Sequence, residues 1–134
     1  MTLLEELKKN NYSFIASNGY HSNDMGIKPV LDRVKEKTNY FEGLEIADKA
    51  IGKASAMLLV LSKVKKVDTI LISKAGMEIL DNYNIPYSFE KTCDYIINRT
   101  GDDMCPMEKT VKDINDLEEA FMALKEKQIQ LAAK

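Results

Sequence analysis

Residues 47–64, ADKAIGKASAMLLVLSKV, decide the predicted fold because they contain the longest apolar run of the chain. The run is apolar on nearly every side from residue 54 to residue 61. This pattern is typical of a helix that other layers of the protein cover. We therefore predict one helix through these residues, at the centre of a layered domain.

The flanking segments alternate between strand and helix patterns. The alternating stretch before Asn18-Gly19 predicts a strand, and this turn dipeptide predicts that a short second strand returns beside it. Further on, Ser73 is a candidate N-cap for a helix, and Asn115 is a candidate cap for the last helix. Strands are predicted at residues 12–17, 20–22, 67–73 and 85–89, with helices after Thr2, from Pro29 to about Lys37, at 74–83, at 106–112 and after Asn115.

This alternation predicts an α/β layered domain. Because a hairpin comes first and helices join the later strands, the sheet should be mixed, antiparallel at its start and parallel afterwards. Residues 93–98, CDYIIN, fit either an extended strand or a helical turn.

Composition predicts one soluble domain over residues 1–134. Apolar residues make up 45% and charged residues 30% of the chain, and the net charge of −2 gives no general attraction for nucleic acid. The beginning of the sequence is unlike a signal peptide, and residues 54–61 are too short to span a membrane. Two cysteines are too few for a disulfide framework. We expect a cytoplasmic protein that contacts neither membrane nor nucleic acid.

Metal and nucleotide motifs are not evident in the sequence. A zinc site needs about three or four suitable ligands, and the chain offers one histidine, His21, with Cys93 and Cys105 twelve residues apart. Neither a phosphate-binding glycine-rich loop nor a G-x-S-x-G nucleophile elbow occurs. We therefore expect no metal site.

The start of the predicted central helix carries the first candidate site. Spacing of four would place Lys49 and Lys53 on one helix face, and Gly52 would admit close approach of another group. Cations at a helix N-terminus and a glycine within a helix both oppose helix stability, as residues kept for function often do. Two lysines beside a helix N-terminus attract an anion. In the alternative interpretation, Asp48 caps the helix and both lysines extend into solvent.

Residues 98–108, NRTGDDMCPME, carry the second candidate. Pro106 suits the first helical position, which makes Cys105 the N-cap and places Glu108 at the third position. A cysteine at a helix start is a candidate nucleophile. The nearby acidic pair of Asp102 and Asp103 disfavours a thiolate, and Arg99 offsets it. A turn followed by a capped helix with a half-buried thiol is the alternative.

Four stretches together resemble one family: GIKPVLDRV (26–34), ADKAIGKASA (47–56), ISKAGMEIL (72–80) and IINRTGDDMCPMEKTV (96–111). In order and spacing they are similar to domain-of-unknown-function family 1893, a branch of the cytidine-deaminase-like superfamily. The resemblance runs from residue 12 to residue 124. It implies a three-layer α/β/α sandwich with a mixed sheet.

The sequence departs from this superfamily at the zinc ligands. Zinc deaminases carry H-x-E at one helix start and P-C-x-x-C at the next. On the layout that the resemblance implies, Asp48 and Lys49 stand in the region of the histidine, and residues 73–76 stand in that of the two cysteines. Zinc-dependent cytidine deamination is therefore not expected, and whether the chain is an enzyme stays open.

We expect the former deaminase pocket to hold a nucleotide-like or phosphate-bearing ligand, with nucleotides and NAD-derived molecules as candidates. One alternative is an enzyme without zinc that uses Cys105 as nucleophile or redox centre. Another is an interaction module without chemistry, in which the amphipathic C-terminal helix binds a partner or self-associates. The expected ligand-binding residues are Asp48, Lys49, Gly52, Lys53, Ser73, Arg99, Gly101, Asp102 and Cys105.

Overall fold

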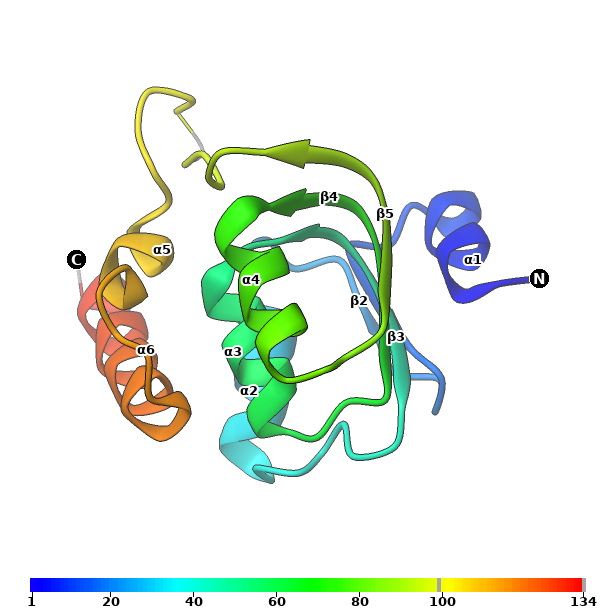
Figure 1. Ribbon diagram of the computed structural model, residues 1–134, viewed down its shortest axis with the longest axis horizontal. Coiled ribbons are helices and arrows are strands. Elements are labelled where there is room, and N and C mark those ends of the chain that lie inside the picture. The colour runs from blue at the N-terminus through cyan, green and yellow to red at the C-terminus, as the bar shows by residue number, and fades with distance from the viewer. Residues whose placement is uncertain (99, 134) are drawn as a thin grey trace.

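The computed structural model describes residues 1–98 and 100–133 and joins its strands in one five-stranded sheet (Figure 1). The strand order is β2-β1-β3-β4-β5. β1 pairs antiparallel with both β2 and β3, whereas β3, β4 and β5 are parallel. The predicted α/β class and mixed sheet are confirmed. The strands are β1 (Phe14–Ala16), β2 (His21–Ser22), β3 (Glu45–Ile51), β4 (Lys66–Ser73) and β5 (Tyr87–Cys93).

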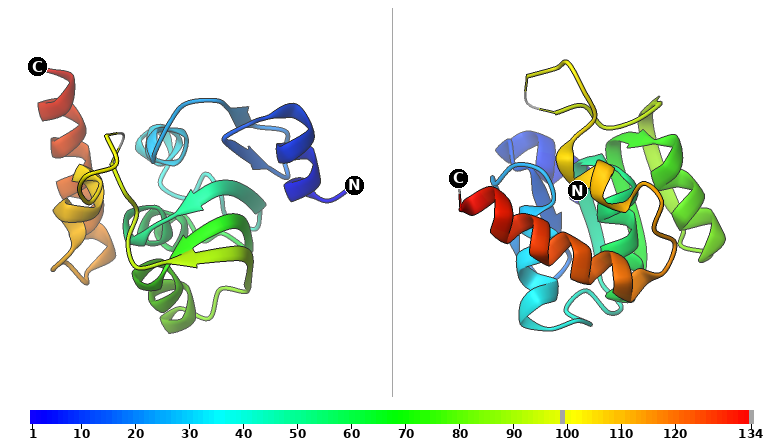
Figure 2. Two further views of the ribbon diagram at one scale, coloured as in Figure 1. Left: turned by 90° about the horizontal axis from the view of Figure 1, so that it is seen from above. Right: turned by 90° about the vertical axis from the view of Figure 1, so that its left-hand side faces the viewer.

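Helices lie on both sides of this sheet (Figures 1 and 2). α2, α3 and α4 cover one face and enclose the main core, and α1 covers a smaller apolar cluster around Leu7, Ile15 and Ala47 on the other face. α5 and α6 pack against the outer side of α3. No helix in the described part of the chain has the length and apolar character needed to cross a membrane. The helices are α1 (Leu3–Asn10), α2 (Lys28–Glu36), α3 (Lys53–Leu61), α4 (Lys74–Asn82), α5 (Pro106–Val111) and α6 (Leu117–Ala132).

The segment that we predicted as one helix is a strand followed by a helix. Residues 45–51 form β3, the middle strand, and α3 begins only after Gly52. Ile46 belongs to the main core and Ala47 to the cluster under α1, so β3 is buried on both faces. A strand covered on both faces loses the alternating pattern by which strands are recognised. The helix prediction was therefore wrong for residues 47–51 and right for α3.

Other local predictions have mixed outcomes. The hairpin is confirmed, with Phe14 opposite Ser22 and Gly19 at a φ of 97°. The Ser73 hydroxyl caps α4 by accepting the Gly76 N–H at 3.0 Å, as predicted. The cap of α6 was predicted wrongly, because Asp116 performs it instead of its neighbour. Residues 94–98 continue neither β5 nor a helix; Ile97 there forms an isolated bridge to Met104.

A carboxylate from α5 caps the central helix α3. Cys105 is the N-cap of α5 and Pro106 its first residue, as the sequence predicts. The side chain of Glu108 accepts the Lys53 N–H at 2.7 Å and the Ala54 N–H at 2.9 Å. These N–H groups belong to the first turn of α3, where no partner exists within the helix. The contact joins α5 to α3 across 55 residues of chain.

Gly52 makes this contact sterically feasible. A Cβ atom at Gly52 would overlap the carboxylate of Glu108. The backbone of Gly52 has a φ of −107°, which any residue adopts, so the requirement for glycine comes from the space and not from the backbone conformation.

We predict that Glu108→Ala and Gly52→Ala each lower the free energy of unfolding by about 3 kcal/mol, because each leaves buried N–H groups without an acceptor. The double variant should lose much less than the sum, since both changes remove one interaction. Urea unfolding of the four proteins measures this coupling. Glu78→Ala, on the exposed side of α4, is the control and should change stability by less than about 0.5 kcal/mol. Additive losses would show that Gly52 and Glu108 act independently.

Candidate functional site

A cavity of about 260 Å³ lies where β3 ends and α3 begins. In open α/β sheets, ligands bind beyond the carboxyl ends of the parallel strands, which is where this cavity lies. Its polar lining includes Ser13, Asp48, Ser55, Cys105 and Glu108, and its apolar lining includes Met25, Ile27 and Ile96.

Of the two carboxyl groups in this lining, Asp48 has the fewer and the longer hydrogen bonds. It lies two residues after Ile46 on β3, so its side chain points to the same side of the sheet, toward α3. The residue is 6% exposed. Within the described residues, the carboxyl has one hydrogen bond, a long one of 3.5 Å from the Ala50 N–H to Oδ1. A buried polar group with so few partners is costly unless a ligand or water completes it.

Burial raises the pKa of Asp48 well above its ordinary value, and the nearby N–H groups of Ala50 and Lys49 oppose this only in part. The protonated form is thus favoured over a wider pH range than for an exposed aspartate. A protonated carboxyl donates through its O–H and accepts through its carbonyl oxygen. Asp48 is therefore suited to form two hydrogen bonds with a ligand that offers one donor and one acceptor.

Glu108 borders the same cavity but is already engaged. Burial raises its pKa, and the N–H groups of Ala54 and Lys53 and the Lys53 charge lower it by less. Both of its oxygens accept hydrogen bonds from the start of α3. A helix N-terminus is a common binding site for a ligand phosphate. Here the protein's own carboxylate occupies it.

The two lysines do not form the predicted cationic pair. Lys49 lies on β3 and borders the cavity, but its ammonium donates to Asn11 Oδ1 at 3.2 Å, at the end of α1. The Lys53 ammonium donates to the carbonyl of Lys112 at 3.0 Å and lies 3.5 Å from Asn115 Oδ1. The prediction that both face one anion was wrong, because it assumed that both residues share one helix.

Several other predicted site residues lie away from the cavity. Ser73 is buried as the cap of α4. Gly101 and Asp102 lie in an exposed loop, where Asp102 accepts hydrogen bonds from Asn98 and Thr100. The loop does not place these residues in the wall, contrary to prediction. Arg99 lies outside the described residues. Of the predicted set, the cavity brings together Asp48, Lys49, Gly52 and Cys105.

The sequence analysis missed part of the lining. Ser55 is the one polar residue in the apolar run 54–61, and that isolation was an available signal. Glu108 was identified only as a residue of the first turn of α5, and nothing local indicated that it reaches α3. The apolar residues Met25, Ile27 and Ile96 come from loops and helix starts and carry no distinctive pattern.

His21 and Cys93 lie outside this lining. The His21 ring stacks on Tyr12 with ring centroids 4.2 Å apart. Burial raises the pKa of the Cys93 thiol, and the charges of Asp94 and Glu108 raise it further. Within residues 1–98 and 100–133, no three His, Cys, Asp or Glu side chains come together in a way that could hold a metal ion.

We predict that Asp48→Asn makes the protein more stable at neutral and alkaline pH. The folded chain holds the Asp48 proton to higher pH than the unfolded chain, so the free energy of unfolding falls as pH rises from 3.8 through the folded pKa. The amide removes this loss, which is about 1.4 kcal/mol for each unit of pKa shift. Urea unfolding between about pH 4 and pH 9 measures it.

The control is Asp113→Asn, which changes an exposed carboxylate and should follow the wild type at each pH. If Asp48→Asn runs parallel to the wild type, burial does not perturb Asp48.

Comparison with known proteins identifies the family. Residues 2–128 match the family described as "Domain of unknown function (DUF1893)". The chain is also similar to the crystal structure of a DUF1893 family protein (TM1506) from Thermotoga maritima, with 31% sequence identity and a TM-score of 0.85. That similarity covers 92% of this chain and 86% of the other. No curated protein matches the sequence. The chain belongs to the DUF1893 family.

Proposed function

We propose that this protein binds a small, uncharged, nucleobase-like heterocycle in the cavity between β3 and α3. The observation that carries the proposal is the Asp48 carboxyl, which is buried, has one long hydrogen bond and lines the cavity. A buried carboxyl of this kind is expensive to maintain, and residues that oppose stability are concentrated at functional sites.

The chemistry of the lining favours the edge of a base. Uracil-like and cytosine-like edges each offer one donor beside one acceptor, which matches a protonated carboxyl. Met25, Ile27 and Ile96 supply the apolar contacts that a flat ring requires, while the Ser55 hydroxyl is available for a polar substituent. The proposed ligand thus has a polar edge and an apolar face.

Size and charge disfavour a ligand whose phosphate enters the cavity. Pockets for drug-sized ligands span roughly 300–1,000 Å³, and this one, at about 260 Å³, suits a base or a compact nucleoside better than a dinucleotide. Two carboxyl groups line it, the ammonium groups of Lys49 and Lys53 are bound elsewhere, and Glu108 covers the N–H groups of α3. The phosphate of a nucleotide would therefore have to remain outside.

The proposal retains the cytidine-deaminase-like assignment of the fold as part of the hypothesis. Its support is the sequence resemblance together with a mixed sheet that has helices on both faces, as a three-layer α/β/α sandwich requires. Asp48 and Lys49 lie on β3, ahead of the helix start at Lys53, and residues 52–55 at that start contain no histidine. In this hypothesis, the deaminase-like pocket still binds a base, and the Asp48 carboxyl forms hydrogen bonds with the edge of that base.

A second candidate function is an enzyme that uses Cys105, and one observation favours it. Cys105 lines the same cavity as Asp48 and Glu108, so a bound ligand would lie beside its thiol. Alkylation with iodoacetamide tests both ideas. A ligand in the cavity should slow the labelling of Cys105 and leave the labelling of Cys93 unaffected. A covalent adduct between Cys105 and the ligand, detected by mass spectrometry without iodoacetamide, would support the enzyme.

We predict that uncharged bases or nucleosides raise the melting temperature, and that Asp48→Ala abolishes the shift. Calorimetry with matched pairs, such as uridine and uridine monophosphate, separates recognition of the base from recognition of phosphate. Lys53→Ala is the matched control, because the Lys53 ammonium donates to the backbone carbonyl of Lys112 and should not contribute to binding of the base. Tighter binding of the phosphorylated member, lost in Lys53→Ala, would overturn the proposal in favour of a phosphate site.

A further inference from the structure

β5 leaves one edge of the sheet unpaired in this chain. It is the last strand in the sheet order, and its sole strand neighbour in the described chain is β4. The Val67 N–H donates to the carbonyl of Pro86 at 3.1 Å, which fixes the even-numbered residues of β5 as those that bond to β4. In a parallel ladder, alternate residues bond to alternate sides. The N–H and C=O groups of Tyr87, Phe89 and Lys91 therefore point outward.

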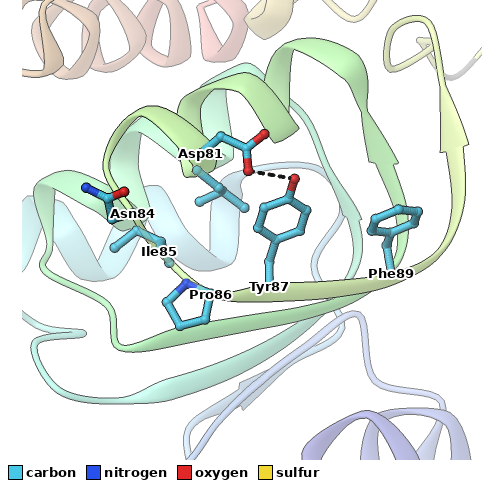
Figure 3. A pocket seen from close by; sticks show the side chains of 7 residues that line it. Asp81, Asn84, Ile85, Pro86, Tyr87 and Phe89 are labelled. Atoms are coloured by element: carbon cyan, nitrogen blue, oxygen red, sulfur yellow. Dashed lines mark hydrogen bonds between the residues drawn. The ribbon is translucent and has the colours of Figure 1, made fainter.

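A groove lies beside this edge, between β5 and the end of α4 (Figure 3). It has a volume of about 650 Å³, with Ile85, Pro86 and Phe89 among its apolar walls. The Tyr87 hydroxyl, also in the groove, donates to Asp81 Oδ1 at 2.9 Å. Phe89 is 44% exposed, a high value for a phenylalanine on a strand. An unpaired edge next to a partly apolar groove is the arrangement that accepts an added strand.

We propose that β5 pairs antiparallel with β5 of a second copy of this chain, with Phe89 opposite Phe89, to form a continuous ten-stranded sheet. In each copy, the N–H and C=O groups of Phe89 point away from β4. The pairing across the two-fold axis therefore requires no change in the hydrogen bonds between β5 and β4. A two-fold axis through this pair makes the interface the same on both copies, as in most homodimers. This inference is independent of the proposed ligand.

The side chains of β5 are complementary in this register. On the α4 side, Lys91 of the second copy lies opposite Tyr87, beside the Asp81 carboxylate that accepts the tyrosine hydroxyl. Symmetry repeats this pairing of opposite charges. On the α1 side, Ser88 lies opposite the second copy's Glu90. Glu90 also forms an ion pair with Lys8 of its own chain, which offsets its charge.

Charge also disfavours one of the two nearest alternative registers. An axis through Glu90 would place the two Glu90 side chains directly opposite each other, and like charges at that position destabilise a strand pair. The other edge strand, β2, has only two residues and offers little to pair with. The C-terminal helix, which we considered as an alternative surface for self-association, exposes the apolar residues Met122 and Ile129 but has, along Leu117–Ala132, no unpaired backbone edge of the kind that β5 offers.

Sedimentation velocity on the full chain tests the dimer. At about 100 μM the wild type should sediment as a dimer if its dissociation constant is micromolar or lower. Lys91→Glu should weaken association by about tenfold or more, because it places like charges together. Combining it with Asp81→Lys should restore association, since the charges are then exchanged and not lost. A wild type that stays monomeric, or a charge exchange without rescue, would overturn the proposal.

Cross-linking identifies the surface through which two copies associate. Phe89→Cys should cross-link between two chains with a short bis-maleimide, well above the background from Cys93 and Cys105. Met122→Cys, on the exposed side of α6, is the control and should not. Circular dichroism confirms that each variant is folded. If Met122→Cys cross-links and Phe89→Cys does not, the dimer forms through α6 and the β5 inference is wrong.

Discussion

The hydrogen bonds from the start of α3 to the Glu108 carboxylate join the outer helix α5 to the central helix of the structure. α3 lies between the sheet and the outer pair α5 and α6, so its N-terminus is buried where solvent cannot satisfy the first N–H groups. Glu108 satisfies two of them, and Gly52 leaves the space for it. The position of α5, and with it one wall of the cavity, depends on this contact.

This contact also shows which features can be predicted from the sequence. Local signals were sufficient for the hairpin at Asn18-Gly19, the Ser73 cap and the start of α5 at Pro106, because neighbouring residues determine each of them. The partner of Glu108 lies 55 residues away in sequence, and no local pattern encodes such a contact. Predicting that a helix start attracts an anion was sound physics, but the anion is a side chain of the protein itself.

The error at residues 47–51 had a larger effect on the predicted site. A middle strand buried on both faces has the same apolar character as a buried helix, and periodicity cannot separate the two. Treating the segment as a helix placed Lys49 and Lys53 on one face, and the phosphate hypothesis followed from that geometry. As a strand, the segment sends the Lys49 ammonium to Asn11 beside α1 and the Asp48 carboxyl toward α3. The segment as a strand therefore favours an uncharged ligand at Asp48, whereas the segment as a helix favoured a phosphate at the two lysines.

The two buried carboxyl groups of the cavity have different roles because their partners differ. Glu108 receives two short hydrogen bonds from a helix N-terminus, so its cost of burial is partly offset and its contribution is structural. Asp48 receives one long hydrogen bond, so most of its cost remains. Because Glu108 already uses the N–H groups at the start of α3 and the Lys49 ammonium donates to Asn11, an anionic ligand would lie beside two carboxyl groups with no free cation to offset them among the described lining residues. An uncharged ligand that hydrogen-bonds to Asp48 offsets the remaining cost without adding another negative charge.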